Sequence, residues 1–155
     1  MKLERVVVGV DGSTNSLAAV EWAAGIAEVS GAEVVAVHAV GLLEHLQGHE
    51  PVSAQQHRDE IRLNFETTWC SPLDRAGVRC RKQVRDGSPV AVLLAVAEDE
   101  DADLIIVGSR GLGGYPELLL GSTSTQVAQN TSRPVTIVPG RNQAEGRPRH
   151  NPERR

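Results

Sequence analysis

Residues 5–13, Arg-Val-Val-Val-Gly-Val-Asp-Gly-Ser, are the stretch that decides the fold. The apolar, β-branched run that ends at Val10 is typical of a buried strand, and Asp11-Gly12-Ser13 directly after it is typical of a turn. Beyond the turn, apolar residues recur at steps of three and four, which predicts a helix from about residue 13 or 14 to Val29. Gly31 is expected to end this helix. Its predicted inward face carries Leu17, Val20, Ala24 and Ala27.

The same alternation of strand and helix continues to residue 139. Short apolar runs predict strands at 33–40, 78–84, 103–107 and 134–139, and helices are expected over about 53–76, 88–100 and 121–130. Pro72 is expected to kink or split the first of these helices. Five such alternations imply an α/β fold with a five-stranded parallel, doubly wound sheet. The expected strand order is 3-2-1-4-5, with the half-polar strand at 78–84 on one edge.

The composition fits one compact domain with an aliphatic core. Apolar residues make up 40% of the chain and aromatic residues only 3%, which leaves almost no material for stacking nucleic-acid bases. The formal net charge is −4, yet residues 141–155 hold five Arg and two Glu, so residues 1–140 carry −7. An acidic body argues against a nucleic-acid partner. We expect a domain over 1–140 and a disordered basic tail over 141–155, either simply solvated or in weak contact with anions.

The sequence also predicts a cytoplasmic protein. The first five residues run into a strand without the cleavage pattern of a signal peptide, and no run approaches the roughly 18 apolar residues of a membrane span. Cys70 and Cys80 fit no redox or metal spacing, so reduced thiols are expected. His45 and His49 are four residues apart, but no further ligand completes a recognisable metal site.

Two unusual turns are expected to meet at one end of the sheet. In the order 3-2-1-4-5 the strand order reverses between strands 1 and 4, and open α/β sheets bind ligands at that point, beyond the strand ends. Strand 1 ends at Asp11-Gly12-Ser13, and strand 4 ends at Gly108-Ser109-Arg110-Gly111-Leu112-Gly113-Gly114. Successive N–H groups of a glycine loop form a concavity for anions, and a helix that begins at Gly121-Ser122-Thr123 adds its positive end. The sequence therefore predicts a phosphate site there.

Two other nucleotide-binding motifs are absent. The phosphate loop GxxxxGK[ST] needs a lysine, and the only lysines, Lys2 and Lys82, are not near a glycine loop. The GxGxxG fingerprint of NAD- and FAD-binding domains should follow the first strand, and it is missing there. Three alternatives stay open: a glycine segment that is merely a flexible loop, Asp11 as a helix cap, and Arg110 as a solvated side chain. His38 is expected to be a hydrogen-bonded structural residue.

The glycines of the second turn resemble the motif of a known family. Four positions match the pattern G-2x-G-9x-G-[S/T] in full: Gly108, Gly111, Gly121 and Ser122. This pattern resembles the ATP-binding motif of the universal stress protein family. The similarity covers about residues 4–139, and it includes Val7-Val8-Gly9-Val10-Asp11-Gly12-Ser13 and the closing Arg133-Pro134-Val135.

The resemblance implies an adenine nucleotide alpha-hydrolase-like fold and a set of residue roles. Asp11, with Gly12 and Ser13 beside it, looks like the acidic position near ribose and adenine. Ala39, expected just past the second strand, looks like the backbone position that contacts adenine. The phosphate and ribose cradle would comprise Gly108, Gly111, Gly121, Ser122 and Thr123, with Arg110 and Gly113 as further candidates from the loop.

The resemblance also implies a metal and a partner. A divalent cation, Mg²⁺ or Mn²⁺, usually accompanies the triphosphate, and the family commonly forms a homodimer through its last strand, here Val135–Val138. One departure lies at Tyr115-Pro116-Glu117, where the proline stiffens the loop and Glu117 adds a negative charge near the phosphates.

We therefore predict an ATP-binding stress-response module, acting as a nucleotide-gated sensor or a partner-binding dimer. No general base and no lysine clamp are evident beside the loop, which disfavours fast hydrolysis and leaves no catalytic residue assigned. The alternatives are a slow ATP hydrolase or phosphotransferase of the same fold, and an interaction protein whose loop binds nothing.

Overall fold

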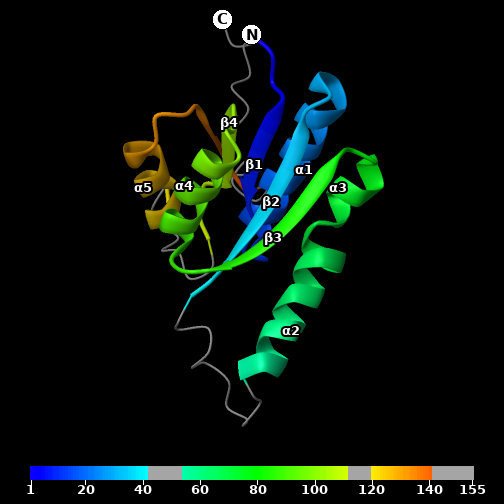
Figure 1. Ribbon diagram of the computed structural model, residues 1–155, viewed down its shortest axis with the longest axis vertical. Coiled ribbons are helices and arrows are strands. Elements are labelled where there is room, and N and C mark those ends of the chain that lie inside the picture. The colour runs from blue at the N-terminus through cyan, green and yellow to red at the C-terminus, as the bar shows by residue number, and fades with distance from the viewer. Residues whose placement is uncertain (42–53, 112–119, 141–155) are drawn as a thin grey trace, which may run out of the picture.

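The computed structural model describes residues 1–41, 54–111 and 120–140 (Figure 1). Some features singled out in the sequence lie outside these ranges: His45, His49, Gly113, Tyr115-Pro116-Glu117 and the basic tail over 141–155.

A five-stranded parallel sheet forms the centre of the molecule. Its strands are β1 (Arg5–Gly9), β2 (Glu33–Val40), β3 (Cys80–Asp86), β4 (Leu104–Gly108) and β5 (Val135–Val138). They lie in the order β3-β2-β1-β4-β5, and every neighbouring pair is parallel. The predicted fold class and strand order are confirmed, although β3 begins at residue 80 instead of 78.

Helices cover both faces of this sheet (Figure 1). One face carries α1 (Thr14–Ser30), the π-helical turn η2 (Phe65–Trp69) and α3 (Ser71–Ala76), and α2 (Ala54–Asn64) leads into η2 and projects away from the sheet (Figure 1). The other face carries α4 (Pro89–Asp99) and α5 (Ser122–Asn130). None of the helices in the described ranges combines the length and the apolar character that crossing a membrane requires.

The core consists of two layers, one on each face of the sheet. In β1, Val6 and Val8 point into the first core layer, under α1, η2 and α3, whereas Val7 points into the second, under α4 and α5. All three valines are fully buried. Because successive side chains of a strand face opposite sides, the central strand joins the two layers, and each buried valine contributes roughly 1.5–3 kcal/mol.

Ser13 and Gly31 bound α1 as predicted. The Ser13 hydroxyl accepts a hydrogen bond from the N–H of Ser16 at 3.1 Å, and Gly31 takes a left-handed backbone with φ 74°. The expectation for Leu17 was wrong, because its side chain is 40% exposed. Small residues dominate the buried face and let the helix lie close to the sheet: Ser16, Ala19, Val20, Ala23, Ala24 and Ala27.

The long helix predicted over 53–76 is divided into three parts. Pro72 lies in the first turn of α3, so the split expected from this proline is confirmed. The π-helical turn before it was not predicted from the sequence. In η2 the N–H of Cys70 donates to the carbonyl of Phe65 at 3.1 Å, a bond across five residues where an α-helix spans four. Phe65 is fully buried in the first core layer and Trp69 packs against that layer.

The two edge strands differ in charge. In β3, Arg81 forms ion pairs with Glu33 at 2.7 Å and Glu100 at 2.5 Å. The sequence of β5, Val-Thr-Ile-Val, carries no charge. Charged side chains on an edge strand oppose pairing with another strand, and their absence from β5 leaves that edge ready to pair.

Two exposed glycines, one inside a helix and one just after a helix, test the helix assignments. A Cβ at Gly25, inside α1, or at Gly77, which follows α3 with φ 65°, would meet nothing within 4 Å. We expect Gly25→Ala to raise the free energy of unfolding by about 0.5–1 kcal/mol, because glycine is a poor residue inside a helix. The matched control Gly77→Ala should lower it, because its backbone is left-handed. Urea titrations measure both, and a loss of stability in Gly25→Ala would contradict the helix.

Candidate functional site

The turn after β1 is built from one carboxylate and two serine hydroxyls. Asp11 Oδ1 accepts the N–H of Ser13 at 2.9 Å, and the N–H of Asp11 donates to the hydroxyl of Ser16 at 3.0 Å. Since the Ser13 hydroxyl caps α1, Asp11 is not the cap, and that alternative is resolved. Gly12, between Asp11 and Ser13, has φ 82°, a backbone conformation that glycine adopts without strain.

The two turns expected to meet at the switch point lie against each other. A Cβ at Gly111 would lie 2.7 Å from Oδ2 of Asp11. A Cβ at Gly108 would lie 2.7 Å from the backbone carbonyl carbon of Asn15, in the first turn of α1. At Gly108 an added carbon would overlap backbone, so only glycine fits there, whereas at Gly111 it would meet the end of a side chain that can move. The glycine loop is therefore packed against α1 at Gly108 and against the turn after β1 at Gly111.

Helix α5 begins beside this contact. Gly121 is its N-cap residue, with φ −77° and ψ 171°, and its N–H donates to the carbonyl of Ser109 at 2.6 Å. A Cβ at Gly121 would lie 3.2 Å from Cα of Arg110, so the glycine allows the loop to approach the helix closely. Ser122 and Thr123 belong to the first turn, whose N–H groups have no partner within a helix and carry its positive end.

Ser109 anchors the glycine loop to the sheet and to α5. Its N–H donates to the carbonyl of Val138 at 2.8 Å, and its carbonyl accepts the hydroxyl of Ser124 at 3.0 Å. Ser109 is 3% exposed, and its own hydroxyl has no hydrogen-bond partner within the described ranges. A buried hydroxyl without a partner is costly, so this group stands out in the loop.

Ala39 lies inside β2, and not past its end as expected. It pairs with Arg85 of β3, and its side chain packs against the second core layer. The strand extends one residue further because Val40 still pairs with Asp86. Its neighbour His38 is 3% exposed, and Nδ1 of His38 lies 2.7 Å from the carbonyl oxygen of Val10, which confirms the expected structural role.

The structure thus brings together most of the expected site residues but not all of them. The turn after β1 and the loop after β4 meet at Asp11 and Gly111, and α5 begins next to them. Ala39 lies near the carboxyl end of β2, the strand beside β1, and takes part in neither of these contacts. Sequence reasoning missed two neighbours of the site, Asn15 under Gly108 and Trp69 against Gly12. Neither had a local signal, because each contact joins segments far apart in the chain.

The two thiols lie away from this site. Cys70 and Cys80 are both free, as expected. Burial raises the pKa of the Cys70 thiol to about 12 and also raises the pKa of Cys80. Both thiols are therefore protonated and poorly reactive near neutral pH.

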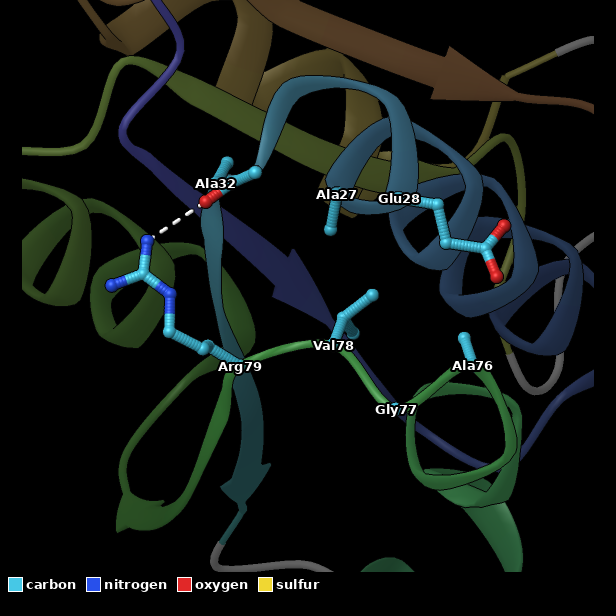
Figure 2. A pocket seen from close by; sticks show the side chains of 8 residues that line it. Ala27, Glu28, Ala32, Ala76, Gly77, Val78 and Arg79 are labelled. Carbon is cyan, nitrogen blue, oxygen red and sulfur yellow. Dashed lines mark hydrogen bonds between the residues drawn. The ribbon is translucent and has the colours of Figure 1, made fainter.

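A hollow of about 320 Å³ lies at the opposite end of the sheet, where β2 and β3 begin (Figure 2). The ends of α1 and α3 border it, and Arg79 spans it by donating to the carbonyl of Gly31 at 2.8 Å (Figure 2). Helix C-termini carry a partial negative charge, so this hollow does not suit phosphate. Its lining comprises Ala27, Glu28, Gly31, Ala32, Ala76, Gly77, Val78 and Arg79.

Alanine substitutions in the loop test this packing. We expect Gly108→Ala to lower the free energy of unfolding by roughly 1–3 kcal/mol, because the new carbon meets the backbone of Asn15, which cannot move cheaply. Gly111→Ala should cost less than about 1 kcal/mol, because the carboxylate of Asp11 can rotate away. Denaturant unfolding of both variants gives the comparison, and equal losses would contradict the packing of β4 against α1.

Comparisons with known proteins agree with the fold and with the sequence pattern. Residues 2–139 match the model of the universal stress protein family. Universal stress protein YxiE of Bacillus subtilis is 32% identical over 145 residues, which cover 86% of this chain and 97% of that protein. Among solved structures, hypothetical protein MJ0577 has a TM-score of 0.75 at 22% identity, covering 90% of this chain and 97% of that chain.

A second solved structure carries a ligand. It is a universal stress protein in complex with cAMP, with a TM-score of 0.71 and 29% identity, covering 90% of this chain and 99% of that chain.

Proposed function

This chain belongs to the universal stress protein family, and on that premise we propose that it binds ATP as a regulatory module without fast turnover. The observation that carries the proposal is the contact between two βα turns. Gly111 faces the carboxylate of Asp11, and the N-terminus of α5 lies directly beside them. The nucleotide bound to the cAMP-complexed relative supports a nucleotide as the ligand.

The chemistry of the loop fits a chain of phosphates. Gly108, Gly111 and Gly121 let the loop, the turn after β1 and the start of α5 pack closely together, so that free backbone N–H groups of the loop can approach phosphate oxygens. The first turn of α5 adds the N–H groups and hydroxyls of Ser122 and Thr123 at the positive end of the helix. The buried Ser109 hydroxyl supplies one more donor.

The other proposed contacts follow the turn after β1 and the end of β2. We assign Asp11, Gly12 and Ser13 to the ribose and adenine side, and the backbone of Ala39 to adenine. Arg110 is proposed to reach a phosphate. Gly113 keeps its proposed place in the cradle, although it lies outside the described residues.

Backbone N–H donors and a divalent cation, in place of a lysine, would balance the negative charge of the phosphates. Lys82 donates to both carboxylate oxygens of Asp74 and to the carbonyl of Glu66, and Lys2 pairs with Glu4. No group of three potential metal ligands occurs in the part of the chain that the structure describes. Mg²⁺ usually keeps several waters and is held largely by the phosphates of its nucleotide, so we propose Mg²⁺ or Mn²⁺ with the triphosphate and assign no residue of this chain to it.

Substitutions at Gly121 test the phosphate site with little damage to the fold. We expect Gly121→Asp to abolish ATP binding in calorimetry, because its carboxylate would stand where phosphate binds. The new side chain crowds Cα of Arg110, but the fold should survive, since aspartate is a good residue at a helix N-cap. Gly121→Asn is the matched control, because it has the same shape and capping ability without the charge, and it should retain more affinity. Unchanged ATP affinity in Gly121→Asp would reject the site.

A homodimer through β5 is the second part of this proposal. The carbonyls of Pro134 and Val138 accept hydrogen bonds from Ile105 of β4 and from Ser109 just after it. The backbone groups of Val135 and Ile137 therefore point toward the free edge. This edge carries no charge, whereas β3 carries Arg81, Lys82 and Arg85. The β5 edges of two copies are therefore the ones expected to pair.

Proline at the free edge tests the dimer. Ile137→Pro removes an outward N–H without removing a bond to β4, so we expect a monomer by light scattering with the secondary structure retained. Val84→Pro is the matched control. The carbonyl of Arg79 accepts a hydrogen bond from β2, and the backbone groups of successive residues point to opposite sides of a strand, so those of Val84 face the free edge of β3. This variant should leave the dimer intact. A dimer that persists in Ile137→Pro and dissociates in Val84→Pro would place the interface at β3 instead.

The proposal takes residues 1–140 as the nucleotide-binding domain, acting in the cytoplasm. The family match over residues 2–139 supports this boundary. Residues 141–155 are left outside the domain.

A further inference from the structure

The indole ring of Trp69 lies against the turn that follows β1. A Cβ at Gly12 would lie 2.6 Å from Cε2 and Cζ2 of Trp69 and 3.1 Å from its Nε1. The ring therefore covers the backbone of Gly12 on the side where a side chain would project. Trp69 is only partly buried, although it also packs against the first core layer.

The π-helical turn η2 and His38 hold this ring in place. The five-residue turn begins with the buried Phe65 and ends with Trp69, and it closes through the hydrogen bond from Cys70 to Phe65. His38 of β2 meets Trp69 edge-on, with ring centroids 5.2 Å apart and an interplanar angle of 68°. The ring of His38 is itself held 2.7 Å from the carbonyl oxygen of Val10. Single π-helical turns often occur at functional sites.

Trp69 and the glycine loop lie on opposite sides of Asp11. The loop and α5 belong to the β4 side of β1, whereas Trp69 contacts His38 on β2, the strand on the other side of β1. Along the edge of the sheet the order is therefore the helix N-terminus, Gly111, Asp11, Gly12 and then the indole. The chemical order is anion donors, a carboxylate and an aromatic surface. A nucleotide has the matching order of phosphates, ribose and base.

We propose that Trp69 contacts the nucleobase of the bound nucleotide and favours purines, whose larger rings cover more of the indole. This inference rests on the proposed nucleotide site, and it adds a specificity-determining residue to it. Base–aromatic contacts of this kind commonly change affinity by about tenfold or more.

Fluorescence reports directly on this contact. The chain has two tryptophans, and Trp22 is 53% exposed on α1. In a Trp22→Phe protein the emission therefore comes from Trp69 alone. We expect ATP to change this emission saturably, and inorganic triphosphate, which has no base, to leave it nearly unchanged. Calorimetry on the same protein gives the affinity of each ligand independently.

Two variants separate a base contact from a purely structural role. Trp69→Leu should weaken ATP about tenfold or more and leave the affinity for inorganic triphosphate unchanged. Trp69→Phe keeps an aromatic ring and should recover part of the loss. Equal weakening of both ligands in Trp69→Leu would mean that the indole only supports the turn, and it would overturn the inference.

The outcomes also distinguish the inference from the proposed function. If the full chain binds ATP by calorimetry but the Trp69 emission does not change, the base contact is rejected and the ATP site stands. If calorimetry detects no ATP binding to the full chain, the ATP site is rejected, and the base contact with it. Should Trp69→Leu fail to fold, the emission of the Trp22→Phe protein still decides.

Discussion

The backbone of Gly108, at the end of β4, touches the backbone of Asn15 in the first turn of α1. This contact fixes the turn after β4 against the turn after β1, and Gly111 consequently comes to face the carboxylate of Asp11. Asn15 also fills the space beside Gly140, two residues after β5, where a side chain would otherwise project. One helical turn thereby contacts the ends of both β4 and β5. The arrangement of the candidate site depends on how closely these backbones approach.

Arginine side chains of this chain form ion pairs that hold its strands and helices together. Arg81 joins Glu33 to Glu100 across the β3 edge, and Arg133 reaches Glu98 and the carbonyl of Ala102. For the phosphate site proposed above, most of the donors are therefore oriented backbone N–H groups, which need no side-chain ordering. The asymmetry extends to the edges of the sheet, since β3 carries charged residues and β5 carries none.

The chain has few aromatic residues, and two of them, Phe65 and Trp69, lie in the same π-helical turn. Phe65 and Trp69 stand at the two ends of η2, on the α1 face of the sheet and next to His38. An α-helical turn in place of η2 would rotate Trp69 relative to Phe65, so the extra residue of the π-helical turn sets where the indole lies. This packing positions the indole against Gly12, at the opposite side of Asp11 from the glycine loop.

The sequence by itself determined the order of strands and helices, the sheet order and the two turns that meet. These features follow from local periodicity, from glycine and proline positions, and from the rules that connect parallel strands. Only the tertiary structure decided that Leu17 is exposed, that η2 interrupts the long helix, and that Asn15 and Trp69 border the site. The physical reason is that each of these depends on which distant segment lies opposite a residue, and spacing along one chain does not encode that.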